Sequence, residues 1–558
     1  MDEAVFRAEV ARARESLRAE LGDVHAAQHA VLTRVLAANA DARFGREHGF
    51  ARLRDLAAYR RAVPIRDDVS MRRWTEAAAR GERSVLTSQE PTLFFRGREA
   101  GCARVVPVTP RYVHEVVLPL AYAAAAPFLQ VPDALARRDA VFTLNWDPSA
   151  PSGRTPAGRP VVGPAELDAV RAFDAPAPLE PGRDAPWMQL PVRVAADDWL
   201  ERLYLRLRVA AASDVQVIAA ADAAQLAGLA DLLDVVAERL VRDLHDGTLS
   251  GVDLGDPRPD LAAALQRQAD AAGRLLPAHV WPRLRLLHCS PVGLAAVFLP
   301  RLREQFGVGV AAGYAPVGSA DAMLGAPLDR HARAVTAAVG RVLFEFVGVD
   351  DEITPDTDTL AAWEVQAGKE YQVVITHVGG AYRYRLDDVV RVVDVVRGVP
   401  RLEPVGSAVP HVVAGVPLRE SHVVRAAVMA GERTGIELRN LRCRDAEGEP
   451  RYELLVEGWQ PLDAEDRELL AAAFDSELAR ASSEYAEARD EARLRPVRLV
   501  EAPTGTFAAH WRRRVERGTP PPQATDRVFE RAPALWAAAA AGSTGGDVVD
   551  VRQRSRVR

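Results

Sequence analysis

Hydrophobic and polar residues follow one another along this chain in two patterns. Over residues 1–90, apolar residues recur every three or four positions, as at Val10, Leu17 and Leu21. This is the spacing of a helix with one buried face. Further along, short apolar runs such as residues 215–219 are separated by helical stretches. The pattern predicts an α/β fold that opens with helices and continues as a large α/β body.

The length of 558 residues is enough for several structural units. Apolar periodicity is lost near residue 405, in a stretch of Gly, Pro, Ser and Val, and a new helix and strand pattern follows it. We therefore expect an N-terminal domain over residues 1–400, a hinge over 401–412 and a small, mobile α+β C-terminal domain over 413–541. Residues 542–558, rich at first in Gly and Ser, are expected to form an unpacked tail.

Composition and charge exclude several classes of protein. Hydrophobic residues make up 48% and charged residues 27%, and the net charge is −6. These values are typical of a globular chain without the basic surface that binds nucleic acid. Three cysteines are too few for a disulfide framework, and no apolar stretch is long enough for membrane insertion. We expect a cytoplasmic protein that binds neither nucleic acid nor membrane.

Several short segments resemble the Gretchen Hagen family of acyl-acid amido synthetases, which has plant and bacterial members. The clearest is Tyr-Arg-Tyr-Arg-Leu-Asp-Asp at residues 382–388. The other segments are residues 42–50, 59–65, 147–149, 281–284 and 344–346. The resemblance covers residues 40 to 530 or so, and it identifies the chain as a divergent bacterial member.

The resemblance implies an adenylate-forming fold, with a large N-terminal adenylation domain, a small C-terminal domain and an active site between them. Family members activate a carboxylic acid with ATP and Mg²⁺ as an acyl adenylate. They then pass the acyl group to an amine, usually that of an amino acid. ATP and Mg²⁺ are thus the cofactors expected from the family.

The first phosphate motif departs from the family pattern T-S-G-T-[ST]-G-x-x-K-x-I-P. Its equivalent, residues 96–107, is predicted to be a loop between two strands and contains no Ser or Thr. Arg98, Gly101 and Arg104 remain as candidate nucleotide contacts, whereas Glu99 brings a carboxylate toward the phosphate position.

The second and third motifs are kept in part. Tyr314 leads the second motif, but Gly318 stands where the family has the glutamate expected at Mg²⁺. In the third, Asp388 matches the aspartate that binds the ribose hydroxyls, and Tyr384 and Arg385 precede it. For such arginines an alternative is a strand side chain paired with a nearby carboxylate.

The C-terminal motifs are also altered. Glu420 is the last residue of a G-E-K-x-x-E pattern that has otherwise lost its charged residues, and Thr525 replaces the C-terminal lysine. Lys369, the single lysine of the chain, lies in a predicted turn. Removing one charge-stabilising group typically lowers a rate by about 10²- to 10³-fold, and several are missing here together. The sequence therefore predicts a degenerate ATP site.

Two residues are candidates for catalysis outside the nucleotide motifs. Cys102 lies in the former phosphate loop and could act as a nucleophile, although an incidental cysteine is the alternative. His377 ends a predicted strand beside the Tyr-Arg segment and is the preferred acid or base, with a structural histidine as its alternative.

Three functions follow from these observations. The first is an enzyme of bacterial secondary metabolism that forms an amide or ester by acyl transfer, without ATP. Its substrates would be a carboxylic acid or an activated acyl donor, together with an amine or hydroxyl acceptor. The second is a non-catalytic descendant that binds an acyl acid or a partner protein. The third is an ATP-dependent ligase whose phosphate site is rebuilt from arginines such as Arg104, with Asp388 as a further nucleotide contact.

Overall fold

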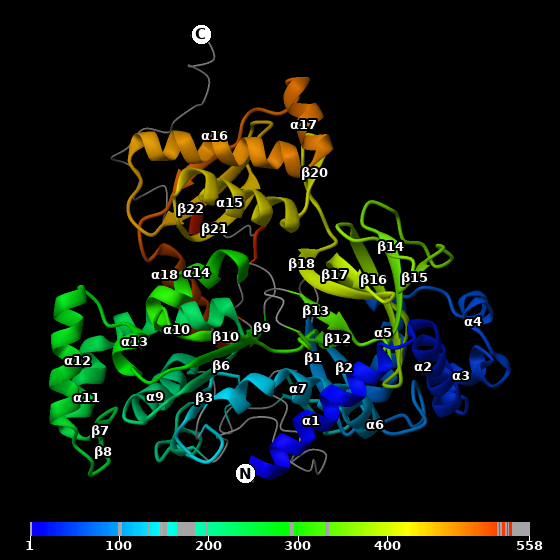
Figure 1. Ribbon diagram of the computed structural model, residues 1–558, viewed down its shortest axis with the longest axis horizontal. Helices are drawn as coiled ribbons and strands as arrows, with labels where there is room; N and C mark the ends of the chain where they lie inside the picture. Colours follow the sequence, from blue (N-terminus) through cyan, green and yellow to red (C-terminus); the bar gives the residue numbers. More distant parts are fainter. Residues whose placement is uncertain are drawn as a thin grey trace.

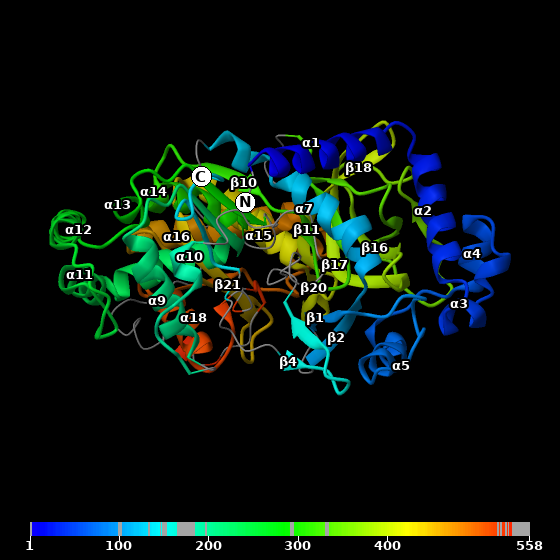
Figure 2. The same ribbon diagram turned by 90° about the horizontal axis from the view of Figure 1, so that it is seen from below.

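The computed structural model has an α/β body with a smaller domain at one side of it (Figure 1). It describes residues 3–98, 103–131, 134–145, 147, 153–163, 185–195, 198–290, 295–329, 334–521, 524, 527–529, 533 and 535–537. The expected tail over 542–558 lies outside these residues. The body has two parts side by side, with α1 to α5 at one end and α9 to α14 at the other (Figures 1 and 2).

The helical opening predicted from the sequence is confirmed. In α1 the residues at helical spacing, including Phe6, Val10 and Leu17, are buried. Asp23 caps α2 by accepting a hydrogen bond from the backbone NH of Ala26 at 3.0 Å. The helices of this segment are α1 (Glu3–Glu20), α2 (Val24–Asn39), α3 (Arg43–Glu47), α4 (Leu56–Ala62) and α5 (Asp68–Ala79).

An eight-stranded sheet forms the centre of this half of the body. Its strand order is β11-β12-β13-β18-β17-β16-β14-β15, and the neighbours pair antiparallel. Its strands are β11 (Val317–Gly318), β12 (Met323–Ala326), β13 (Val335–Ala337), β14 (Leu343–Gly348), β15 (Leu360–Ala361), β16 (Glu370–His377), β17 (Ala381–Val396) and β18 (Val399–Ser407). Strand β18 occupies the first part of the range expected to be a hinge.

The strand, loop and strand expected around residues 94–109 are present as an antiparallel pair. They are β1 (Leu93–Arg98) and β2 (Ala103–Val108), and β1 also pairs with β5 (Pro160–Val162), which pairs with β4 (Gly153–Arg154). The helical stretch after β2, residues Pro110–Gln130, has the length and hydropathy of a membrane span, yet 61% of it is buried. It comprises α6 (Pro110–Tyr112), η2 (Val113–Val117), α7 (Leu118–Ala124) and η3 (Ala126–Gln130), and α7 packs against α1 and β12 as a core helix does.

The other half of the body contains a parallel sheet in the order β10-β9-β6-β3. Its strands are β3 (Val141–Thr143), β6 (Val217–Asp222), β9 (Leu286–Ser290) and β10 (Ala311–Tyr314). The remaining elements of this half are η5 (Pro186–Met188), α9 (Trp199–Ala211), α10 (Ala223–Val235), α11 (Ala237–Asp246), β7 (Thr248–Leu249), β8 (Val252–Asp253), α12 (Pro259–Ala272), α13 (Pro277–Val280) and α14 (Ala295–Phe306).

The C-terminal domain is a three-stranded sheet covered by helices, above the body in Figure 1. Its elements are β19 (His411–Val413), β20 (Val416–Leu418), α15 (Glu420–Thr434), β21 (Leu438–Asp445), β22 (Tyr452–Gly458), α16 (Ala464–Ala481), α17 (Ser483–Asp490), β23 (Arg498–Glu501) and α18 (Thr506–Glu516). One hydrophobic core runs from the parallel sheet into this domain, where Trp511 of α18 packs on α10 at Gly228.

Candidate functional site

The residues that could carry chemistry meet where the two sheets of the body face the C-terminal domain. Arg104 comes from β2 and Tyr384 from β17, while Asp321 lies between β11 and β12. Asp68 begins α5. In open α/β sheets this side, beyond the carboxyl ends of the parallel strands, is the usual place for a ligand.

Both terminal nitrogens of Arg104 are engaged, by two carboxylates and a phenol. Its Nη1 lies 2.5 Å from Oδ1 of Asp68, and its Nη2 lies 2.5 Å from Oδ2 of Asp321. Nη1 also donates to the hydroxyl of Tyr384 at 2.7 Å, and that hydroxyl donates to Asp68. The side chains of Arg104, Asp68 and Asp321 are only 12%, 14% and 14% exposed. We call these four residues the Arg104 cluster.

Electrostatics in the Arg104 cluster keep the guanidinium charged. Burial opposes this, but the hydrogen bond and charge of Asp321 raise the pKa of Arg104 above its ordinary value. Burial also raises the pKa of Asp321, against the opposing effect of Arg104, so the carboxyl is the easier partner to neutralise. With two carboxylates on one guanidinium, the cluster carries no spare positive charge for a phosphate.

The expected magnesium ligand has no room at its position. A Cβ added at Gly318 would lie 2.5 Å from the carbonyl oxygen of Ala322 and 2.8 Å from Cα of Met323. Among the residues that the structure describes, no three His, Cys, Asp or Glu side chains form a group that could hold a metal ion. Among the described residues, the position of Gly318 therefore leaves no room for the glutamate that the family places at Mg²⁺.

Asp388 is the carboxylate of this site that stays accessible. Its side chain is exposed, and within the described part of the chain no hydrogen bond or ion pair holds it. The surrounding protein, followed by the charges of Asp321, Asp387 and Glu420, raises the pKa of Asp388 to about 6. A pKa of about 6 suits proton transfer near neutrality.

Glu420 joins the C-terminal domain to the central sheet. Its Oε2 accepts from the backbone NH of Ser407 at 3.2 Å, and its Oε1 accepts from that of Val528 at 3.3 Å. A Cβ at Gly406 would lie 2.6 Å from Oε2 of Glu420, so this glycine permits the close approach. Both carboxylate oxygens are used in contacts within the protein.

His377 has the features of a structural histidine. Its Nε2 donates to the backbone oxygen of Asp321 at 2.8 Å, and its Nδ1 accepts from the backbone NH of Gly379 at 3.0 Å. Its ring stacks on Tyr112 at 4.4 Å, and burial lowers the pKa of His377 to about 4. Both ring nitrogens are therefore used in hydrogen bonds to backbone groups, and neither is free for proton transfer.

The remaining sequence candidates are only partly described. Tyr314 ends β10 and is half-buried, and Arg385 is half-buried on β17 beside Asp67, whose carboxylate it helps to stabilise. The side chain of Arg98, and Gly101 and Cys102 entirely, lie outside the described residues.

Two members of the Arg104 cluster were not expected in their observed role. Asp68 carries no motif, and nothing in the sequence marks it as a partner of Arg104. Asp321 lies three residues after Gly318, and its carboxylate is paired with Arg104 rather than placed toward a metal position.

The architecture defines the class of protein. A two-part α/β body with a small α+β domain beside it matches the solved structure of the acyl acid amido synthetase AtGH3.15 in complex with 2,4-DB. The TM-score is 0.77 at 17% identity, covering 95% of each chain. A second structure, the GH3.15 acyl acid amido synthetase, matches with a TM-score of 0.76 at 18% identity and the same coverage. The expected fold class is thus confirmed.

Sequence comparison gives the family. The GH3 family N-terminal, central and C-terminal domains match residues 13–309, 335–406 and 422–525. This chain belongs to the GH3 family, the Gretchen Hagen family named above. One similar relative is a probable indole-3-acetic acid-amido synthetase of Oryza sativa subsp. japonica, 23% identical over 67% of this chain and 68% of that protein. Another is a jasmonoyl-L-amino acid synthetase of the same species, 28% identical over 30% and 34% of the two chains.

Proposed function

We propose that this protein forms an amide or ester bond by transferring an acyl group to an amine or hydroxyl, from a donor that is already activated. The observation that carries the proposal is the Arg104 cluster. Its one guanidinium is bound by two carboxylates at 2.5 Å each. A triphosphate would have to displace both carboxylates and would then face their charges in a poorly hydrated site.

The substrate class follows from the family. The relatives are named as synthetases that join an acid to an amine, in two cases indole-3-acetic acid and a jasmonoyl group. We extend this class to the present chain as a carboxylic acyl group and an amino-acid amine, with a hydroxyl acceptor giving the ester. The protein is proposed to act in the cytoplasm, consistent with two buried, unpaired cysteines, Cys289 and Cys443.

Asp388 is the group that would accept the proton in this reaction. With an acyl thioester as donor, the amine nitrogen attacks the carbonyl carbon, a C–N bond forms and the C–S bond breaks. The proton lost by nitrogen passes to the carboxylate of Asp388 and then to the leaving thiolate. Asp388 is suited to this step because it is exposed and has no hydrogen bond or ion pair within the described chain.

A non-catalytic acyl-acid binder is the second candidate, and His377 favours it. His377, which ends the strand beside the Tyr-Arg segment, uses both ring nitrogens in hydrogen bonds to backbone groups. A descendant that only binds a ligand or a partner protein needs no titrating histidine, so it could function with His377 held in this way.

The first test is titration of the full chain with ATP and Mg²⁺ by thermal shift and calorimetry. The proposal expects no saturable response up to several millimolar ATP. A saturating response, followed by exchange of pyrophosphate into ATP with candidate acids, would establish the ligase instead.

The second test supplies acyl thioesters with amino acids or alcohols and measures release of the free thiol. Turnover that is lost in Asp388→Asn and kept in Asp387→Asn supports the transferase, because the two exposed aspartates are neighbours on β17. Saturable binding of a carboxylic acid without turnover would support the binder.

A further inference from the structure

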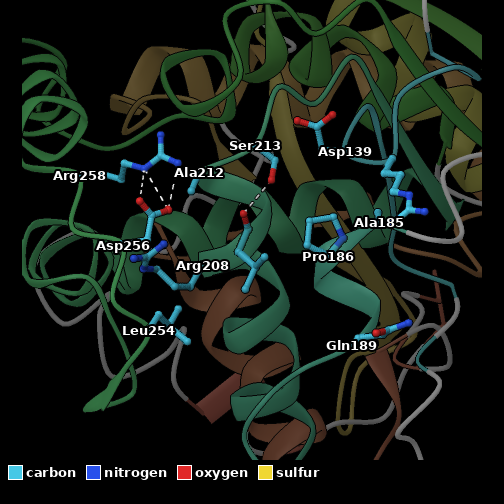
Figure 3. Close-up of a pocket in the computed structure, with 12 residues that line it drawn as sticks. Asp139, Ala185, Pro186, Gln189, Arg208, Ala212, Ser213, Leu254, Asp256 and Arg258 are labelled. Atoms are coloured by element: carbon cyan, nitrogen blue, oxygen red, sulfur yellow. Dashed lines mark hydrogen bonds and ion pairs between the residues drawn. The ribbon is translucent and has the colours of Figure 1, made fainter.

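A cavity of about 770 Å³ opens on the body (Figure 3). Arg138 and Asp139 of its lining come just before β3, and Ser213 comes just before β6. These are the amino ends of the parallel strands, whereas the Arg104 cluster faces the carboxyl ends. The cavity is therefore separate from the proposed active site, and the inference below does not rest on the proposed function.

Arg208 supplies an unusual charge to this cavity. It is 2% exposed, yet its Nε and Nη2 donate only to backbone oxygens, of Thr248 at 3.1 Å and Asp243 at 2.9 Å. Within the described chain its Nη1 has no hydrogen-bond partner, and no carboxylate oxygen lies within ion-pair distance of its guanidinium. Burial lowers the pKa of Arg208, the direction expected for a cation short of a counter-charge.

Nearby carboxylates act on Arg208 only at longer range: burial has the largest effect on its pKa, and the charges of Asp243 and Asp256 oppose it. Asp139 is paired with Arg137 at 2.9 Å, and Asp256 is paired with Arg258 at 2.9 Å, as Figure 3 shows for the second pair. The carboxylate of Asp243 accepts from the hydroxyl groups of Tyr204 and Thr248 at 2.5 and 2.6 Å and from the NH of Ser250 at 3.2 Å.

The lining of the cavity thus has a positive excess. Arg138 stands exposed at the edge and has no partner among the described residues. A buried cation without a contacting counter-ion is unfavourable, and an anion placed in the cavity would add to the compensation that Asp243 and Asp256 give from beyond ion-pair distance. Val209, Ala212 and Leu254 add apolar surface beside the two arginines.

We propose that this cavity is a binding site for a small organic anion, whose carboxylate or phosphate group pairs with Arg208 while its apolar part lies against Val209 and Leu254. Guanidinium groups bind both oxyanions through paired hydrogen bonds. Arg138 closes the edge of the site and adds long-range attraction.

The test measures binding of sodium hexanoate and of inorganic phosphate by calorimetry and thermal shift, against sodium chloride of equal ionic strength. We expect a saturable response to at least one of the two probes. Hexanoate alone identifies a carboxylate ligand, and phosphate alone identifies a phosphate ligand. In Arg208→Gln the dissociation constant should rise about tenfold or more, because a charge-assisted contact is lost.

Two further variants keep the test decisive if Arg208→Gln fails to fold. Arg138→Gln changes an exposed residue and should weaken binding most at low salt. Arg242→Gln removes the same charge from an exposed site on α11 outside the cavity and should bind as the wild type does. The proposal is overturned if neither probe exceeds the chloride control. It is also overturned if the probe that binds the wild type binds Arg208→Gln, or Arg138→Gln, as tightly as it binds Arg242→Gln, since binding would then lie elsewhere.

Discussion

Replacing Arg104 by glutamine tests whether this residue is a structural ion-pair partner or a free phosphate ligand. The change removes one cation and leaves the carboxylates of Asp68 and Asp321 beside each other, both 14% exposed. Glutamine keeps a side-chain amide that can donate a hydrogen bond, so the loss of charge dominates the effect.

The expected loss of stability can be worked from this geometry. Removing one partner of a buried ion pair typically costs about 3–5 kcal/mol, because the other charge stays buried without a counter-ion. The cluster retains a little solvent access, so we expect the lower end, about 3 kcal/mol in the free energy of unfolding at pH 7.

The pH dependence gives a second, independent readout. The pKa of Asp321 is already raised in the folded protein, and loss of Arg104 removes the main effect that lowers it. The folded variant then binds more protons than the unfolded chain as the pH falls through the folded pKa, so its stability rises relative to wild type. The deficit should shrink steadily between neutral and mildly acidic pH.

The assay is urea unfolding followed by tryptophan fluorescence, with two comparison variants. Arg104→Gln combined with Asp321→Asn should recover much of the stability, because a charge is removed from each side. Arg7→Gln breaks a pair of 2.8 Å whose partners are 56% and 45% exposed, and should change stability by about 0.5 kcal/mol or less. If Arg104→Gln is as stable as Arg7→Gln and loses ATP binding that the wild type shows, Arg104 is a phosphate ligand and not a structural ion-pair partner.

Substitutions at three more positions test the space at Gly318, the pKa of Asp388 and the contact between α10 and α18. Gly318→Glu should not create a response to MgCl₂ and should lower the free energy of unfolding by about 1–3 kcal/mol, because the clash with Ala322 is already present at Cβ. Thermal unfolding with and without MgCl₂ measures both effects. Gly318→Ala should be destabilised too, for the same reason. Asp388→Asn should be more stable than wild type at pH 8. The pKa of Asp388 in the folded protein, about 6, lies above the unfolded value, so the wild type loses stability as the pH rises through this range. The free energies of unfolding of the two proteins should therefore become equal near pH 4. A difference that stays constant with pH would contradict the raised pKa. Gly228→Leu should displace Trp511, now 3.1 Å from a Cβ at that position, and speed limited proteolysis around α18; an unchanged cleavage rate would show that this contact does not hold the domain.

Local patterns in the sequence were enough to predict most of the helices and strands described here. The helical spacing predicted for residues 1–90 is observed in α1, where Val10 and Leu17 are buried. A helix with one buried face can be predicted in this way because its apolar residues repeat with the period of the helix. The strands β1 and β2 were equally visible, since each is an apolar run beside a polar loop. The family motifs added the order of the domains.

The site could not be read in the same way, because its chemistry depends on contacts between distant segments. Arg104 looks like a phosphate ligand in the sequence, but its partners Asp68 and Asp321 come from a helix start and a loop with no motif linking them. His377 was preferred for its ordinary pKa, and burial has lowered that pKa to about 4. The same enclosure acts in the opposite direction on Asp388, which the sequence had assigned to ribose binding.

Arg104 and Arg208 together show how charge is distributed in this chain. A site that takes a triphosphate must keep positive charge unneutralised, yet here Asp68, Asp321 and Asp388 outnumber the single guanidinium of Arg104. At the opposite edge of the parallel sheet, Arg208 is buried without a carboxylate partner in the described chain. Coulomb energy alone therefore favours an anion beside Arg208 over an anion at the Arg104 cluster. A response to phosphate or carboxylate that survives Arg104→Gln and is lost in Arg208→Gln is what this distribution requires.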